Sequence, residues 1–238
     1  MFRATFIVVL IAAFAASLAH AQTGAPNGEW PYWGGDAGST RYAALDQINT
    51  QNVADLEVVW RWKALPLGEN PDGNLKATPL MIDGVLYTST GMHQAAAINA
   101  ATGETIWTFS PEPLEISRHP VGMSGRGLAY WTDGDDARLF HNTSDGRLIA
   151  IDAKTGVRCA DFGRDGYVYL KEELSPDPNP KVGSSSPPIV VGDVVVVQVV
   201  PSAINPSRKE AAPGHIRGYD VRTGKRLWIF HTVPQAGE

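Results

Sequence analysis

The 238-residue chain contains a single cysteine, Cys159. A disulfide needs two thiols, so an internal disulfide framework is excluded. Cys159 is expected to be a buried structural thiol, with a reactive thiol as the alternative. The chain also has no excess of positive charge, since 20 Lys and Arg against 25 Asp and Glu give a net charge of −5. Nucleic-acid binding, which relies on a basic face, is therefore not favoured.

The N-terminus carries an apolar run that is short for a membrane-spanning helix. The run from Phe6 to Leu18 follows Arg3 and precedes Ala19-His20-Ala21, which is a small-x-small pattern. This order is typical of a secretory signal peptide. We expect residues 1–21 to be removed and the mature chain to be exported. An uncleaved anchor is the alternative.

Turn-forming residues are abundant, with 24 Gly and 17 Pro, and some of them belong to a repeat. The repeat reads small residue, apolar, Asp or Asn, two residues, Thr-Gly, three residues, Trp. It occurs at 97–107 and 218–228, and 150–160 has the same form with Ala160 in place of the Trp. Its glycines are Gly103, Gly156 and Gly224. Self-similarity at this spacing predicts a recurring structural unit.

Each unit predicts four short strands joined by tight turns, because Asp-Gly or Gly-Asp between apolar runs is a strong hairpin signal. The expected strands are 79–82, 85–88, 95–99 and 105–109 in the first unit; 127–131, 138–142, 147–152 and a weak one around 158–162 in the second; and 188–191, 194–200, 215–220 and 225–230 in the third. Residues 163–182 and 201–214 are expected to be loops.

Four antiparallel strands repeated radially describe the blades of a β-propeller. One blade cannot bury both of its faces, so its neighbours supply the core. The repeated Trp suits a ring wedged between blades with its N–H bound at an edge. We therefore expect an all-β chain with about three blades in 56–238. Because three blades would leave an open ring, we expect the chain to be the N-terminal part of a longer protein. An intact domain of another all-β type is the alternative.

A lead-in of residues 22–55 precedes the blades. Its aromatic cluster at 30–33 is expected to pack on the domain. Residues 51–56 suggest a short helical turn with Thr50 as N-cap. Residues 57–62, which are rich in Val and Trp, are expected to form a strand that closes the ring against the last blade.

These motifs together resemble the pyrroloquinoline-quinone (PQQ)-dependent dehydrogenases, most closely the quinoprotein glucose dehydrogenase branch. The matching segments are Trp30-Pro31-Tyr32-Trp33-Gly34-Gly35-Asp36, Arg41-Tyr42, Ala77-Thr78-Pro79-Leu80, Arg126-Gly127-Leu128-Ala129-Tyr130-Trp131, Asp161-Phe162-Gly163, Ser185-Ser186-Pro187-Pro188 and Ile216-Arg217-Gly218. Asp-Phe-Gly also occurs in protein kinases, but neither a Gly-rich nucleotide loop nor a catalytic-loop signature accompanies it here.

The resemblance implies an eight-bladed propeller in the full-length protein, with PQQ near the central axis. It implies that a sugar or alcohol is oxidised by hydride transfer to the quinone, that Ca²⁺ polarises the quinone, and that electrons pass to ubiquinone or a cytochrome. In such enzymes the cofactor carries the redox chemistry and the protein orients it. The resemblance also implies a periplasmic location, with membrane association through the electron acceptor.

The resemblance assigns three residues of this chain to the cofactor: Arg126, Ser185 and His119. Arg126 would pair with a quinone carboxylate, which a guanidinium binds bidentately. Ser185 would donate a hydroxyl hydrogen bond, and His119 lies in the loop before the arginine. The alternatives are a solvated arginine at a strand start, turn chemistry at Ser185, and a surface histidine. The catalytic aspartate is expected beyond Glu238, so no catalytic residue is assigned here.

The chain also departs from the family pattern. Pro120 and Val121 stand where the alcohol and methanol branches carry adjacent cysteines, and Lys76 stands where an acidic contact is usual. Oxygen ligands for calcium cannot be assembled from this segment, since Glu210 is out of register. These departures leave a second function open, a non-catalytic propeller scaffold for protein–protein interaction at the cell envelope, because assembly scaffolds share the Thr-Gly-Trp repeat.

Overall fold

The computed structural model describes residues 24–64, 75–91, 93–111, 126–172, 174, 182–184, 186–201, 213–234 and 237. These residues form three four-stranded antiparallel sheets and one two-stranded pair. Two short 3-10 turns, Pro26–Gly28 and Val53–Asp55, lie in the lead-in. The expected all-β chain with about three four-stranded blades is confirmed.

Each sheet is a blade whose strands follow one another in chain order. Blade one contains β1 (Leu80–Ile82), β2 (Val85–Ser89), β3 (Ala95–Asn99) and β4 (Thr105–Phe109); blade two contains β5 (Ala129–Thr132), β6 (Ala137–Asn142), β7 (Arg147–Asp152) and β8 (Tyr167–Tyr169); blade three contains β10 (Ile189–Val191), β11 (Val194–Gln198), β13 (Ile216–Asp220) and β14 (Arg226–Phe230). The remaining pair joins β9 (Val182–Gly183) to β12 (Val200–Pro201).

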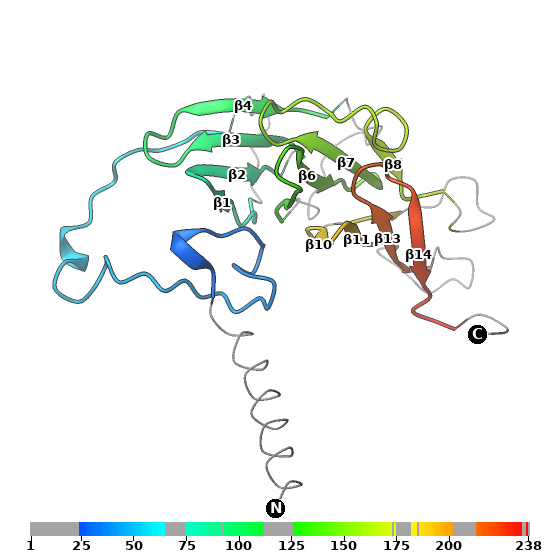
Figure 1. The fold of residues 1–238 in the computed structure, drawn as a ribbon, viewed down its shortest axis with the longest axis horizontal. Coiled ribbons are helices and arrows are strands. Elements are labelled where there is room, and N and C mark those ends of the chain that lie inside the picture. The colour runs from blue at the N-terminus through cyan, green and yellow to red at the C-terminus, as the bar shows by residue number, and fades with distance from the viewer. Residues whose placement is uncertain are drawn as a thin grey trace, which may run out of the picture.

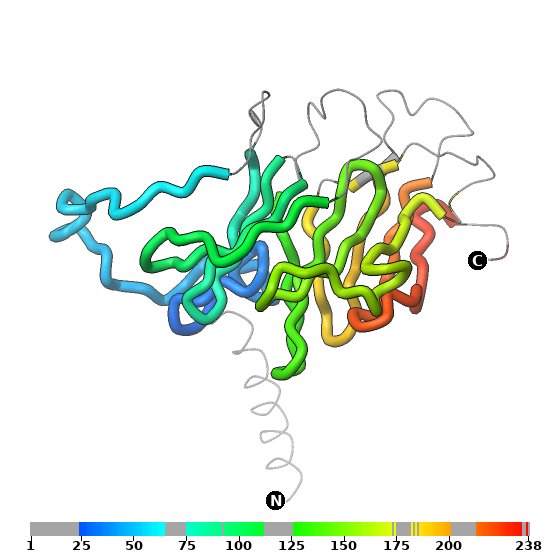
Figure 2. Tube along the Cα trace, turned by 90° about the horizontal axis from the view of Figure 1, so that it is seen from above, coloured from blue at the N-terminus to red at the C-terminus, as the bar shows by residue number. Residues whose placement is uncertain are grey.

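The three blades follow one another along an arc, from β1 at one end to β14 at the other (Figure 1). Viewed from above, the N-terminal segment lies beside blade one (Figure 2). The innermost strands of blades two and three, β5 and β10, contact each other. Two apolar clusters fill the joints between blades, as the propeller interpretation requires. The cluster between blades one and two includes Leu80, Ala97, Leu139 and Ile151; that between blades two and three includes Phe140, Leu148, Phe162, Val195 and Val197.

The repeated Asp/Asn-x-x-Thr-Gly segment forms the same turn in all three blades. In blade two, Asp152 Oδ1 accepts hydrogen bonds from Lys154 N at 3.0 Å and Thr155 N at 2.7 Å, and Gly156 N donates to Asp152 O at 2.9 Å. Asn99 and Asp220 make the matching bonds in the other blades. The glycines have φ of +67° to +75°, which a residue without a Cβ adopts at little cost. The sequence repeat is thus a repeated Asx turn.

A tryptophan from the preceding segment lies on the glycine of this turn at two joints. A Cβ added at Gly103 would lie 2.6 Å from the Trp60 ring, and one added at Gly156 would lie 2.6 Å from the Trp107 ring. The two indole N–H groups donate to the backbone carbonyls of Ala100 and Ala153. The wedge expected for the repeated Trp is therefore confirmed for Trp107, and Trp60, which lies outside the repeat, makes the same contact.

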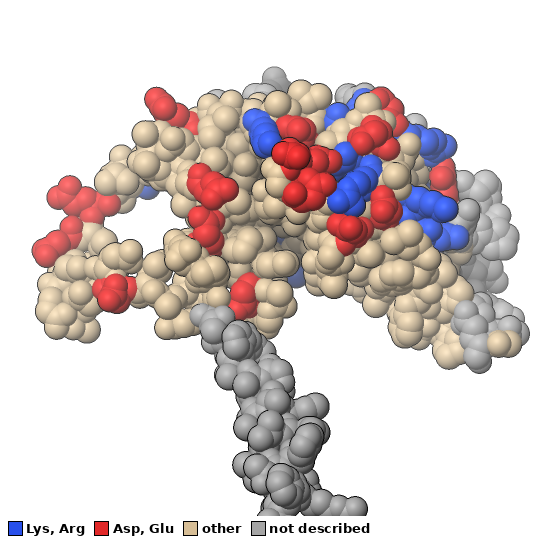
Figure 3. All heavy atoms as spheres, viewed as in Figure 1, with Lys and Arg blue, Asp and Glu red and all other residues tan. Residues whose placement is uncertain are grey.

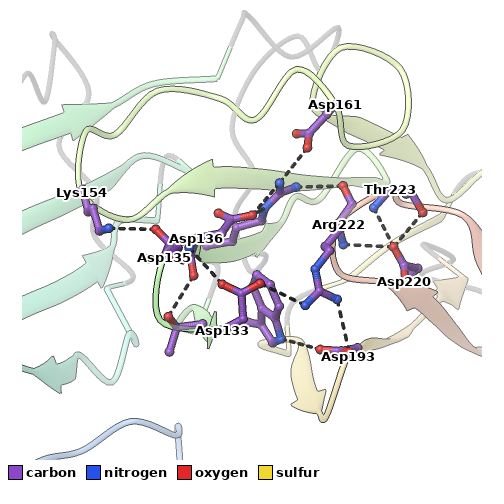
Figure 4. A network of polar contacts seen from close by, with 12 residues as sticks. Asp133, Asp135, Asp136, Lys154, Asp161, Asp193, Asp220, Arg222 and Thr223 are labelled. Carbon is purple, nitrogen blue, oxygen red and sulfur yellow. Dashed lines mark hydrogen bonds and ion pairs between the residues drawn. The ribbon is translucent and has the colours of Figure 1, made fainter.

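The third joint, between blades two and three, is built differently because Ala160 replaces the Trp. Here Gly163 N donates to Thr223 O at 2.8 Å. A polar network spans the same joint (Figure 4): Arg138 binds Asp136 and Asp161 and donates to Arg222 O, while Arg222 pairs with Asp133 and Asp193. Backbone contacts and ion pairs thus take over where the indole is missing.

Five local expectations need correction. The fourth strand of blade two is β8, not 158–162, because without the Trp only Arg158 bridges to Ile151; residues 163–182, expected to be a loop, therefore contribute two strands, β8 and β9. Residues 57–62 form no strand, and Trp60 and Trp62 contact blade one through their side chains. The expected closure of the ring against a last blade stays a prediction. The N-cap of Val53–Asp55 is Asn52 rather than Thr50. The second strand of blade three ends at Gln198 instead of 200.

The lead-in packs on blade one, as expected for its aromatic cluster. Trp30 forms a bridge with Met81 of β1, with N–H···O distances of 2.8 and 3.1 Å. The carboxylate of Glu29 accepts from Asp83 N at the first hairpin turn. Ala25, only 1% exposed, donates its N–H to Tyr42 O. The lead-in therefore acts as an additional edge of the first blade.

Candidate cofactor site

Gly127 is the point at which four of the sequence motifs meet. A Cβ added there would lie 3.3 Å from Thr78 O, 3.3 Å from Trp33 Cδ1 and 3.7 Å from Pro187 Cγ. These neighbours come from the lead-in, the start of blade one and the start of blade three. The structure therefore brings together four segments, each 45 to 60 residues from the next in the sequence, at the inner strands of the arc.

Arg126 precedes this meeting point and is held there by its backbone. Its carbonyl accepts the Thr78 N–H at 3.0 Å, while its side chain is exposed. Among the described residues, no acidic side chain forms an ion pair with this guanidinium. The backbone is thus fixed and the charged group is free to bind an anion, which a planar guanidinium does bidentately.

A buried polar contact joins blades two and three close to this point. Asn142 Nδ2 donates to Ser184 Oγ and to Ser186 O, both at 2.6 Å. Asn142 and Ser184 are almost fully buried. Ser186 is part of the Ser-Ser-Pro-Pro motif, so Asn142 positions the segment that carries Ser185. The sequence analysis did not single out Asn142, because one Asn at a strand end carries no distinctive pattern.

Two buried histidines lie between blades one and two. His93 Nε2 lies 2.8 Å from Ser144 Oγ, and the His93 and His141 rings are 6.0 Å apart. Burial, together with the nearby His93, lowers the pKa of His141 to about 3, against an opposing effect of the His93 and Gly127 backbone. His141 is therefore neutral at physiological pH. It lies next to Gly127 and so supports the backbone that carries Arg126.

Neither histidine pair of the described chain was visible from sequence spacing. His93 and His141 are far apart in sequence, and His215 faces His231 across β13 and β14 with ring centroids 4.6 Å apart. The packing of blade one on blade two creates the first contact, and the pairing of β13 with β14 creates the second. A search for closely spaced histidines detects neither. Among the described residues there is no group of three or more His, Cys, Asp or Glu that could hold a metal ion.

The remaining predicted residues are distributed as follows. His119 and Ser185 lie outside the described residues, as do Pro120, Val121 and Glu210. Lys76 is exposed, two residues before the Thr78 that binds Arg126 O. Of the three residues predicted to contact the cofactor, the structure describes only Arg126, and all three contacts stay predictions. Within the described part of the chain, no helix is long and apolar enough to cross a membrane.

Charged side chains of both signs are interspersed over the second and third blades (Figure 3). The Arg138 and Arg222 networks account for part of this pattern. Each of these cations is matched by acids at the surface. Arg126, like the exposed Arg61 and Lys76, forms no ion pair among the described residues, so its role at a ligand stays a prediction.

Comparison with known proteins is consistent with this geometry. A family model described as "PQQ: Glucose/ethanol/alcohol dehydrogenase, beta-propeller domain" matches residues 30–238. The chain is 34% identical over 235 residues to quinoprotein glucose dehydrogenase A of Acinetobacter calcoaceticus, covering 90% of this chain and 29% of that protein. It is 32% identical over 220 residues to the dehydrogenase subunit of the alcohol dehydrogenase (quinone) of Gluconobacter oxydans, covering 92% of this chain and 26% of that protein.

A solved structure shows the same arrangement of blades. The quinohemoprotein alcohol dehydrogenase of Comamonas testosteroni superposes with a TM-score of 0.69 at 30% identity, covering 87% of this chain and 27% of that one. The chain therefore spans between a quarter and a third of the length of these relatives.

Proposed function

The chain belongs to the family of glucose, ethanol and alcohol dehydrogenases with a PQQ β-propeller domain, and we propose that it forms one wall of a PQQ site at the inner strands of its blades. The observation that carries the proposal is Arg126. Its backbone is fixed by Thr78, and its guanidinium has no acidic partner among the described residues.

The residues at this point fit the cofactor chemically. PQQ carries several carboxylates, and an arginine stays charged at every physiological pH and presents a planar set of donors. Bound PQQ would supply the hydride-accepting quinone. The role of this chain is binding and orientation: Arg126 holds a carboxylate, and the packing of Gly127 against Trp33, Thr78 and Pro187 sets where the guanidinium lies.

Ser185 and His119 are the other proposed cofactor contacts of this wall. Ser185 would donate its hydroxyl to the cofactor, and Asn142 fixes the neighbouring Ser186 through a 2.6 Å hydrogen bond. His119 is proposed as a contact on the segment before Arg126. The proposed substrate is a sugar or alcohol, the class on which the named relatives act. The oxygen ligands of Ca²⁺ and the catalytic base would be supplied by residues outside the described part of this chain.

The cellular setting is also a proposal. Arg3, the apolar run that follows it and Ala19-His20-Ala21 support export through a cleaved signal peptide. In the periplasm, electrons would leave for a quinone or a cytochrome. Because the chain spans under a third of its relatives, we propose that it does not turn over substrate by itself.

The test is PQQ binding by the purified chain, followed through quenching of its tryptophan fluorescence. Arg126→Gln is expected to weaken binding by about tenfold or more, since a hydrogen-bonded charge contributes roughly 1.5–3 kcal/mol. Arg61→Gln is the matched control, because Arg61 is exposed and lies in the extended segment on the outside of blade one. Its affinity should equal that of the unchanged chain.

Equal affinity of the Arg126→Gln variant and the unchanged chain would refute the role of Arg126. Complete absence of PQQ binding would favour the scaffold function instead. Dye reduction with glucose or simple alcohols is then assayed on the complete reading frame with PQQ and Ca²⁺. Turnover by residues 22–238 alone would contradict the proposal that the chain needs further residues.

A further inference from the structure

The joint between blades two and three contains a pocket. Its volume is about 210 Å³, and it lies between the outer strand of blade two and the two outer strands of blade three. Its lining includes Arg164, Glu172, Arg217, Gly224, Arg226 and three tyrosines. Gly224 is the turn glycine of this joint, and its nearest neighbours are Gly163 and Val168 rather than an indole ring.

Arg217 is the most unusual of these residues because it is 1% exposed. Its Nη1 donates to Leu170 O at 3.3 Å and to Glu172 O at 3.2 Å. Its Nε and Nη2 are buried and have no hydrogen-bond partner. No carboxylate among the described residues pairs with it. A buried cation without a counter-ion costs several kcal/mol, so this arrangement is incomplete.

The two unsatisfied atoms also specify the shape of the missing partner. Nε–H and Nη2–H lie on one edge of the guanidinium and point in the same direction, whereas Nη1 is engaged with backbone carbonyls. Two parallel donors of this kind match the two oxygens of a carboxylate or a phosphate. Because both atoms are shielded from bulk water, a partner from solution must enter through the pocket that Arg217 lines.

The charge around the pocket favours an anion as well. Arg164, Arg217 and Arg226 contribute three positive charges to its lining, against one negative charge from Glu172. Glu172 is already paired with Arg164 and its side chain is 57% exposed, so it is not available to Arg217. The remaining lining residues are uncharged, and three of them are tyrosines with hydroxyl groups.

We propose that this pocket is a binding site for a small oxyanion, a carboxylate or phosphate, held side-on by Arg217. The site lies at the outer strands, away from the inner strands that carry Arg126. It is therefore independent of the proposed PQQ site, and either proposal can fail without the other.

The experiment measures the thermal stability of the purified chain, without PQQ, against succinate and against inorganic phosphate, with NaCl at matched ionic strength as reference. The unchanged chain should show a saturable rise in Tm of roughly 2–4 °C with at least one of the two anions. The anion with the lower Kd shows whether the site prefers a carboxylate or a phosphate.

Three variants locate the effect. Arg226→Gln removes one exposed charge from the pocket lining and should raise the Kd about threefold to tenfold, in line with a charge-assisted contact. Lys225→Gln is the matched control, because Lys225 is the exposed neighbour in sequence but does not line the pocket. Arg217→Lys keeps the charge but loses the two-pronged geometry, and should abolish the saturable response.

Should Arg217→Lys fail to fold, the pair Arg226→Gln and Lys225→Gln still decides the outcome. A response to succinate and phosphate no larger than that to NaCl would overturn the proposal. So would an unchanged Kd in Arg226→Gln, or an equal loss in Lys225→Gln, since either result would place the anion elsewhere.

Discussion

The indole ring of Trp107 lies directly on Gly156: a Cβ added at Gly156 would be 2.6 Å from Trp107 Cδ2. The Trp107 N–H donates to Ala153 O at 3.0 Å, from the same turn. One side chain of blade one thus fixes both the distance and the orientation of blade two. This relationship requires a glycine for two reasons, the close ring and a φ of +73°.

We expect Gly156→Ala to destabilise the chain more than the same change at Gly84. Gly84 has a φ of +75° but nothing within 4 Å of an added Cβ. Both variants carry the backbone strain of about 1 kcal/mol, and only Gly156→Ala adds a clash of roughly 1–3 kcal/mol. Urea denaturation measures the two free energies of unfolding. Equal losses would show that the ring contact contributes little.

The stability of the chain should fall in acid because of His141. Its pKa is about 3 in the folded state and near 6.5 when unfolded. The unfolded state therefore binds more protons below pH 6.5, and the contribution of neutral His141 is lost progressively from pH 6.5 towards pH 3. The loss across that window is on the order of a few kcal/mol.

His141→Leu isolates this effect, because leucine is apolar and does not titrate. The difference in unfolding free energy between the two proteins, followed from pH 7 to pH 4 by urea denaturation, should shift in favour of the variant as the pH falls. Parallel pH profiles would contradict a buried neutral histidine at this position.

Removal of Arg138 should weaken the joint between blades two and three. Its side chain is 7% exposed and binds Asp136 at 2.8 Å and Asp161 at 2.7 Å (Figure 4). Arg138→Met leaves both acids without their cation and should cost about 1–3 kcal/mol of unfolding free energy. The control is Asp165→Asn, since Asp165 is 71% exposed in its pair with Arg158 and should change stability by no more than about 0.5 kcal/mol. Thermal unfolding measures the stability loss of each variant. Similar losses in both would contradict the larger contribution of the buried Arg138 pairs.

Cys159 should react slowly with thiol reagents in the folded chain. Burial raises the pKa of its thiol to about 11, with Arg138 acting weakly in the opposite direction. Only about a thousandth of the thiol is then ionised at pH 8, and the thiolate is the nucleophile. Ellman's reagent should label the chain at a much higher rate in denaturant. Fast labelling of the native chain would support the alternative of a reactive thiol.

Much of the blade architecture could be predicted from local patterns. The hairpin around Asp83-Gly84 joins β1 to β2 as expected, with Ile82 opposite Val85. The prediction failed where the local signal was weakest. Without a tryptophan near 160, the fourth strand of blade two forms later, at Tyr167–Tyr169, where Arg147 pairs in register with Tyr169. The pairing of two strands this far apart in the sequence depends on which segment packs best against β7. The hydrophobic periodicity of the sequence does not contain that information.

The candidate site was predicted only through its motifs. Arg126 could be named from its sequence context, but its fixed backbone depends on Thr78, which lies 48 residues earlier. The roles of Asn142 and His141 could not be anticipated, because an Asn or a His in a strand has the same local appearance whether it faces solvent or a neighbouring blade. Their contacts arise from the stacking of blades.

The sequence by itself determined the repeating unit, because an Asx turn needs only an Asp or Asn, a Thr and a Gly within five residues, as in Asp152 to Gly156. The tertiary structure alone decided what lies between the units. It placed Trp107 on Gly156, gathered four motifs around Gly127, and buried Arg217 without a counter-ion among the residues that the structure describes. Turns form from neighbouring residues, whereas joints depend on side chains from different blades, and their fit exists only once the blades have packed.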